Sequence, residues 1–131
     1  MKRDIKNRAD IEMLVNVFYE RVNKDRILGP VFNEVVNINW EKHLPVFYDF
    51  WDNVVFYSGT YEGNPVRLHT KLYKLTSLEK KHFTRWLDIF SAVIDEFYEG
   101  EKAELMKEKG RSMAKIIREQ LAKNDRFKRT I

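Results

Sequence analysis

The chain has 131 residues, of which 44% are apolar and 34% are charged, and this composition suits one soluble domain with a single core. It contains no cysteine, so disulfides, thiolate metal sites and cysteine nucleophiles are excluded. No run approaches the roughly 20 apolar residues of a membrane span, and the first ten residues are too polar for a secretory signal. We therefore expect a cytoplasmic protein with no membrane partner.

The positive charge is concentrated at the C-terminal end. The formal net charge is +4, and residues 118–131 account for +3 of it. We expect a single domain over residues 1–131, in which residues 122–131 form a basic and frayed tail. Such a tail can touch nucleic acid or anionic lipid, but Phe127 is its only aromatic residue, so we do not expect a nucleic-acid partner.

The scarcity of glycine and proline predicts an all-helical fold. The chain holds only five glycines and three prolines, and no alternation typical of strands persists. Asp10 can cap a first helix, and Gly29-Pro30 marks where that helix has ended. Its apolar residues recur at helical spacing: Ile11, Leu14, Val15, Phe18 and Val22.

A second helix, which Asn39 can cap, is predicted to carry the apolar residues Phe47, Phe50, Trp51, Val54 and Val55. Pro45 interrupts this pattern. Because proline has no N–H to donate within a helix, either the regular helix begins only a residue or two before Pro45 or the helix is kinked there.

Three further helical segments follow. Asn64-Pro65 predicts a short helical piece through His69. Ser77 opens the clearest helix, which Gly100 closes, and its broad apolar stripe consists of Phe83, Trp86, Leu87, Phe90, Val93, Ile94 and Phe97. The last helix is predicted from about Glu101 past Leu121, and Gly110 on its apolar stripe can allow a close helix crossing.

Aromatic residues and histidines are the chemically distinctive part of the sequence. Eight of the eighteen aromatic residues fall between Trp40 and Tyr61, and the three histidines are His43, His69 and His82. Each histidine can simply be a hydrogen-bonded core or surface residue. No HxxxH zinc pair, nucleophile elbow or phosphate-binding glycine loop is present. An aromatic helical core with imidazoles on two separate helices would suit a planar apolar macrocycle with an axial ligand.

Five blocks in order resemble the third group of truncated haemoglobins, from about Ile11 to Leu121. The blocks are Phe18-Tyr19-Glu20-Arg21-Val22, Leu28-Gly29-Pro30-Val31-Phe32, His43-Leu44-Pro45 with Phe50-Trp51, Gly63-Asn64-Pro65 with His69, and Arg85-Trp86-Leu87 with Phe90. The chain has no Gly-Gly pair, which fits the third group better than the first two. The resemblance implies a two-over-two helical sandwich around one haem b, an iron protoporphyrin IX.

The resemblance assigns roles to nine residues. His69 matches the proximal ligand of the haem iron. Tyr19, His43 and Trp86 match the distal positions, where a phenol O–H and an indole N–H can hold the negative end of a bound diatomic gas. The apolar haem-binding positions are matched by Phe18, Phe32, Phe47, Trp51 and Phe90, with Phe32 wedging the haem edge. Ordinary core packing is the alternative role of these five residues.

The function that the resemblance implies is binding of dioxygen, nitric oxide and carbon monoxide by a monomeric haem protein. Two distal donors would slow oxygen release, which disfavours oxygen transport and favours nitric oxide dioxygenation or peroxide reduction, with electrons from a separate reductase. One alternative is a haem-based gas or redox sensor that acts through a separate partner. Another is a cofactor-free helical interaction domain whose aromatic residues are only core.

Overall fold

The computed structural model describes residues 2–31, 40–57 and 79–130, with side chains up to residue 119. Its helices are α1 (Arg8–Lys24), α2 (Trp40–Phe56), α4 (Lys80–Phe97) and α5 (Glu101–Thr130). The described ranges contain no strand, which confirms the all-helical prediction. None of the helices in these ranges is long and apolar enough to cross a membrane.

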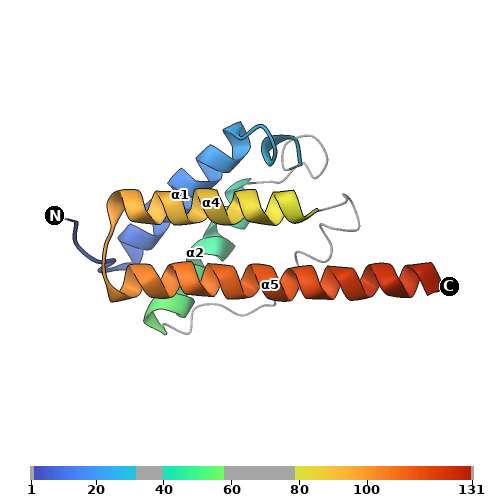
Figure 1. Cartoon of the computed structure of the whole chain (residues 1–131). Coiled ribbons are helices and arrows are strands. Elements are labelled where there is room, and N and C mark those ends of the chain that lie inside the picture. The colour runs from blue at the N-terminus through green and yellow to red at the C-terminus, as the bar shows by residue number, and fades with distance from the viewer. Residues whose placement is uncertain (1, 32–39, 58–78, 131) are drawn as a thin grey trace.

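The four helices form two crossed pairs (Figure 1). Helices α4 and α5 run antiparallel side by side, and the turn at residues 98–100 joins them. Helices α1 and α2 lie behind this pair in the view and run diagonally across it. Helix α1 packs on both α2 and α4, and α5 packs on both α4 and α2. One core therefore lies between the two layers.

Helical periodicity correctly predicted the buried faces of α1 and α5. All five apolar residues expected on the inner face of α1 are buried. On α5 the buried positions include Ala103, Met106 and Ile117. Gly110 is also buried, and a Cβ atom placed there would lie 2.7 Å from Cε2 of Phe90 on α4. The expected close crossing at Gly110 is confirmed, because only a glycine lets the Phe90 ring occupy this position.

The start of α1 differs from the prediction. The helix begins at Arg8, and the side-chain oxygen of Asn7 accepts a hydrogen bond from the backbone N–H of Asp10. Asp10 was therefore wrongly predicted as the cap. Its carboxylate instead accepts two hydrogen bonds from the Arg3 guanidinium, at 2.7 and 2.9 Å, and one from the Lys6 N–H. A local pattern could not distinguish two residues that are both good caps.

The start of α4 differs from the prediction, whereas that of α2 does not. Helix α2 begins at Trp40, the position expected for a helix that follows Asn39, and Pro45 lies inside it, so the alternative of a start only one or two residues before Pro45 is excluded. Helix α4 begins at Lys80 rather than at Ser77. The Nδ1 atom of His82 accepts a hydrogen bond from the Glu79 N–H at 2.8 Å, so His82 closes the first turn of α4. The predictions on Asn39, Asn64 and Pro65 fall outside the described residues.

Residues 2–7, which we call the N-terminal strap, tie the start of α1 to the turn between α4 and α5. The Glu99 N–H donates to the Arg3 carbonyl at 3.0 Å, and the Asp4 carboxylate accepts from the N–H groups of Lys102 and Ala103 at the start of α5. Ile5 is buried between these contacts. The strap thus satisfies N–H groups at the first turn of α5 that have no partner within the helix. The helix itself continues to Thr130, and fraying of residues 122–131 stays a prediction.

Candidate functional site

A buried tyrosine on α1 and a tryptophan on α4 form the polar centre of the aromatic core. Tyr19 is only 8% exposed, and Trp86 is half-buried. Burial raises the pKa of the Tyr19 phenol well above its ordinary value, while a hydrogen bond with the Trp86 side chain acts in the opposite direction. An indole nitrogen can only donate, whereas a phenol can both donate and accept, so the two side chains bring two donors to the cluster.

Helices α1 and α4 also contribute the aromatic rings that support this pair. The Phe18 ring lies edge-on to Tyr19, Trp86 and Phe90, with centroid distances of 4.7, 5.1 and 5.2 Å. Trp86 stacks on Phe90 at 4.9 Å with an interplanar angle of 15°. Trp51 of α2 contacts Phe90 from the other side at 4.9 Å. The position of the indole is therefore fixed by packing on several sides.

The α2 side of the site contains Phe47 and His43. The Phe47 ring stacks on Tyr19 at 4.9 Å with an interplanar angle of 20°. His43 is half-buried and lies parallel to the Phe47 ring at 6.3 Å. Through Phe47, the imidazole is linked to the same cluster as Tyr19. Seven of the nine residues singled out from the sequence thus belong to one connected aromatic cluster: Phe18, Tyr19, His43, Phe47, Trp51, Trp86 and Phe90. The other two, Phe32 and His69, lie outside the described residues.

Sequence reasoning missed two contributors to this cluster. Trp40, the first residue of α2, contacts the Tyr19 ring at 5.1 Å. Its signal was present in the sequence, because Trp40 and Phe47 are seven residues apart and therefore share a helix face. Gly110 was expected to allow a close crossing, but its part in the site was not foreseen. A Cβ atom at Gly110 would lie 3.6 Å from the Trp86 ring in addition to its clash with Phe90.

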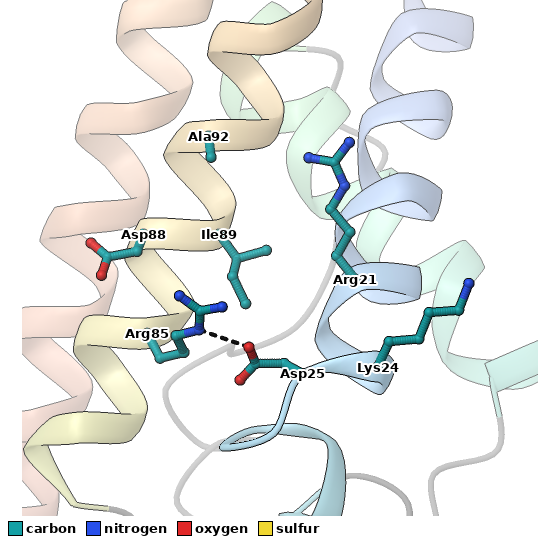
Figure 2. A pocket seen from close by; sticks show the side chains of 7 residues that line it. All are labelled: Arg21, Lys24, Asp25, Arg85, Asp88, Ile89 and Ala92. Atoms are coloured by element: carbon teal, nitrogen blue, oxygen red, sulfur yellow. Dashed lines mark hydrogen bonds and ion pairs between the residues drawn. The ribbon is translucent and has the colours of Figure 1, made fainter.

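A separate groove lies on the outer surface between α1 and α4 (Figure 2). It is lined mainly by charged side chains: Arg21, Lys24, Asp25, Arg85 and Asp88, together with Ile89 and Ala92. The Arg85 guanidinium donates to Asp25 at 2.7 Å across the groove. Burial tends to raise the pKa of Asp25, but hydrogen bonds from the Leu28 N–H and Arg85 lower it overall.

This ion pair serves the site indirectly. Arg85 and Trp86 are consecutive on α4, yet one bonds to Asp25 on the surface and the other packs in the aromatic cluster. Arg21 also donates to Glu96 at 2.5 Å, further along the same two helices. The two ion pairs hold α1 against α4 on the surface, while Phe18 and Trp86 join the same two helices within the aromatic cluster. We therefore assign the groove a structural role.

The buried N–H and O–H groups of the cluster define its chemistry. Two donors surrounded by rings can hold a small polar ligand more strongly than in water, because little solvent competes for them. The rings alone can face a flat apolar molecule. A buried phenol whose pKa is raised stays protonated at neutral pH and acts as a donor rather than as a base.

Comparison with known proteins agrees with the architecture and with the motifs. No protein-family model matches the chain. The chain is 28% identical over 126 residues to the group 3 truncated hemoglobin ctb of Campylobacter jejuni, which covers 94% of this chain and 97% of that protein. The crystal structure of the group III truncated hemoglobin from Campylobacter jejuni matches with a TM-score of 0.79 at 27% identity, over 92% of this chain and 95% of that one. The resemblance drawn from five sequence blocks and the globin-like fold are thereby confirmed.

Proposed function

We propose that this relative of the group III truncated haemoglobins is a haem protein that binds dioxygen and nitric oxide and removes nitric oxide or peroxide rather than carrying oxygen. The observation that carries the proposal is that the phenol of Tyr19 is only 8% exposed and packs against aromatic rings of the cluster that also contains Trp86. A cluster that served only as core would gain more from apolar side chains at these positions than from two donors.

The residues of the cluster fit a haem b. The donors Tyr19 and Trp86 suit the distal side, and the apolar walls would be formed by Phe18, Phe47, Trp51 and Phe90, with Phe32 at the haem edge. His69, which lies outside the described residues, would hold the iron through a neutral ring nitrogen. When bound, the haem would supply an iron atom that holds a diatomic gas and exchanges electrons.

The protein's own residues would select and hold the gas. The Trp86 N–H and the Tyr19 O–H would donate to a ligand oxygen that carries partial negative charge, and each such bond contributes about 1.5 to 3 kcal/mol. His43, beside Phe47, would supply a further polar contact or close the entry to the pocket. With two donors the ligand would leave slowly, which suits chemistry on the ligand better than transport.

The proposed reactions require a partner that delivers electrons. Nitric oxide dioxygenation combines one NO, one O2 and one electron to give nitrate. Peroxide reduction converts one H2O2, two protons and two electrons to two water molecules. Because the haem iron only passes electrons on, a separate reductase would have to resupply the electrons that each turnover consumes. We further propose that the protein works as a cytoplasmic monomer.

Absorption spectra of the haem-loaded wild type and of His69→Ala test the proposal. The wild type is expected to bind one haem with a histidine-ligated spectrum in its ferric, ferrous and CO-bound forms, and His69→Ala should lose it. Mixing ferrous protein in dioxygen with nitric oxide in a stopped-flow device should then give nitrate and ferric protein rapidly. If neither protein binds haem, the chain is a cofactor-free helical domain; if haem binds but nitrate does not form, dioxygenation is wrong.

A further inference from the structure

Rings from two helices enclose the Tyr19 phenol. Phe47 stacks on it at 4.9 Å, Trp40 lies tilted against it at 5.1 Å with an interplanar angle of 46°, and Phe18 meets it edge-on at 4.7 Å. Phe47 and Trp40 both come from α2, two helical turns apart. Among the residues that the structure describes, helix α2 therefore contributes two of the three ring contacts on Tyr19.

The three neighbours constrain the phenol differently. Phe18 is adjacent to Tyr19 on α1 and moves with it, so it cannot fix Tyr19 relative to α2. Phe47 stacks on the ring and allows it to slide or rotate in the stacking plane at little cost. Trp40 is tilted by 46° to the ring, so it contacts the phenol in a different plane from Phe47.

Polar contacts hold α2, and with it Trp40, in register on α1. Arg8 on α1 bonds to Asp49 at 2.7 Å, and it also lies 3.5 Å from Asp52. The Tyr48 hydroxyl donates to Oδ1 of Asn16, which precedes Tyr19 by less than one helical turn. Tyr48 and Asp49 directly follow Phe47, so these contacts anchor α2 to α1 next to the ring that stacks on Tyr19. The ring of Trp40 is thus carried by a helix that is itself anchored beside Tyr19.

We propose that Trp40 is a positioning residue for Tyr19: its ring holds the phenol between α2 and α1 so that the O–H group keeps one orientation beside Trp86. This inference rests on the proposed haem function only for its effect on ligands. The contact itself joins two side chains of the protein and involves no haem atom. Trp40 is half-buried whereas Tyr19 is 8% exposed, so their contact joins the buried phenol to a less buried part of α2.

The first experiment is fluorine NMR of the haem-free full chain labelled with 3-fluorotyrosine. The Tyr19 signal is assigned by its loss in Tyr19→Phe. Trp40→Ala is expected to shift this signal toward that of solvent-exposed fluorotyrosine, and Trp40→Phe should restore it because a ring is retained. Val46→Ala, at a position on α2 that is 41% exposed, is the matched control and should leave the signal unchanged.

The second experiment measures the haem-loaded proteins by the infrared stretch of bound carbon monoxide and by the rate of dioxygen release. Trp40→Ala should broaden the stretch and move it toward its position in Tyr19→Phe, and should speed release about fivefold, less than the effect of Tyr19→Phe. Trp40→Phe should resemble the wild type. Unchanged stretch and release rate in Trp40→Ala would overturn the proposal.

Both experiments distinguish failure of this inference from failure of the proposed function. If the chain does not bind haem, the fluorine signal still decides whether Trp40 positions Tyr19. If haem binds and the fluorine signal of Trp40→Ala equals that of the wild type, Trp40 is only a packing residue. Circular dichroism verifies folding of each variant, and Trp40→Leu replaces Trp40→Ala if the latter does not fold, with the same expected shifts.

Discussion

The aromatic cluster around Tyr19 and the end of the molecule held by the N-terminal strap are built on opposite principles. At the strap end, each carboxylate accepts several hydrogen bonds from within the protein. Asp4, for example, accepts three from the backbone N–H groups of Ile5, Lys102 and Ala103. In the cluster, rings supply most of the contacts between the described residues, and the polar groups of Tyr19 and Trp86 stand among them. The strap end uses its polar groups to join chain segments, whereas the cluster retains a donor that can bind a ligand.

This difference separates stability from ligand binding. A polar group whose partners are all within the protein contributes to the folded state and has nothing left for a ligand. A buried hydroxyl that both accepts and can still donate contributes little to stability and more to binding. Substitutions at the strap end should therefore change the free energy of unfolding, and those in the cluster should change ligand release.

The largest effect is expected from Tyr19→Phe. The variant keeps the ring contacts and removes the O–H donor, so dioxygen release from the haem-loaded protein should become about 10- to 100-fold faster, as loss of about 1.5 to 3 kcal/mol implies. The free energy of unfolding in urea should change by less than about 1 kcal/mol. Tyr57→Phe, at a tyrosine that is 78% exposed, should change neither quantity. Equal release rates in Tyr19→Phe and wild type would contradict a distal role for the phenol.

Asp10→Asn should affect stability and its pH dependence, with ligand release unchanged. The hydrogen bonds from Arg3 hold the pKa of Asp10 far below its usual range, against the opposing effect of burial. A carboxyl with a lowered pKa in the folded state stabilises the protein above its unfolded pKa of about 4, and this contribution is lost as pH falls further.

At neutral pH we expect Asp10→Asn to lose about 1 to 2 kcal/mol, because the Arg3 partner is half exposed and solvent weakens the pair. Urea unfolding at pH 7, 5, 4 and 3 checks this, and the difference between variant and wild type should shrink at the two lowest pH values. Asp88→Asn, at an exposed position, serves as the control. A difference that stays constant with pH would show that the charge of Asp10 does not contribute.

Gly110→Ala tests whether packing of α5 on α4 reaches the site. A Cβ atom 2.7 Å from the Phe90 ring must displace that ring, which stacks on Trp86. Overpacking costs about 1 to 3 kcal/mol and the helix gains about 1 kcal/mol from alanine, so we expect a net loss of about 1 kcal/mol. The carbon monoxide stretch should also shift, because Trp86 moves. Ser112→Ala, at an exposed position on the same helix, is the control and should stabilise the protein slightly without changing the carbon monoxide stretch. If the stretch is also unchanged in Gly110→Ala, the packing of α5 on α4 does not affect the site.

The same contrast explains what the sequence could predict. The inner faces of α1 and α5 followed from spacing, because burial of one helix face is a local property. The strap was not predicted, since Asp4 is bonded to Lys102 and Ala103 at the far end of the sequence, and this pairing is set by tertiary contacts. Tyr19 and Trp86 were identified together through the resemblance, not through periodicity, which shows a face but not the partner across it. For that reason Trp40 was visible as an aromatic residue at helical spacing from Phe47, yet its contact with Tyr19 required the packing of α2 on α1.

The smallest effect is expected from Arg85→Gln, which breaks the ion pair with Asp25 in the surface groove. Arg85 is 45% exposed while Asp25 is buried, so the loss should be about 0.5 kcal/mol in urea unfolding and smaller at high salt. Dioxygen release should match the wild type, because Arg85 contacts Asp25 and not the cluster. If dioxygen release changed as much as in Tyr19→Phe, the ion pair in the groove would be controlling the neighbouring Trp86. Polar contacts at the junction of α1 and α4 would then affect ligand binding as well as stability.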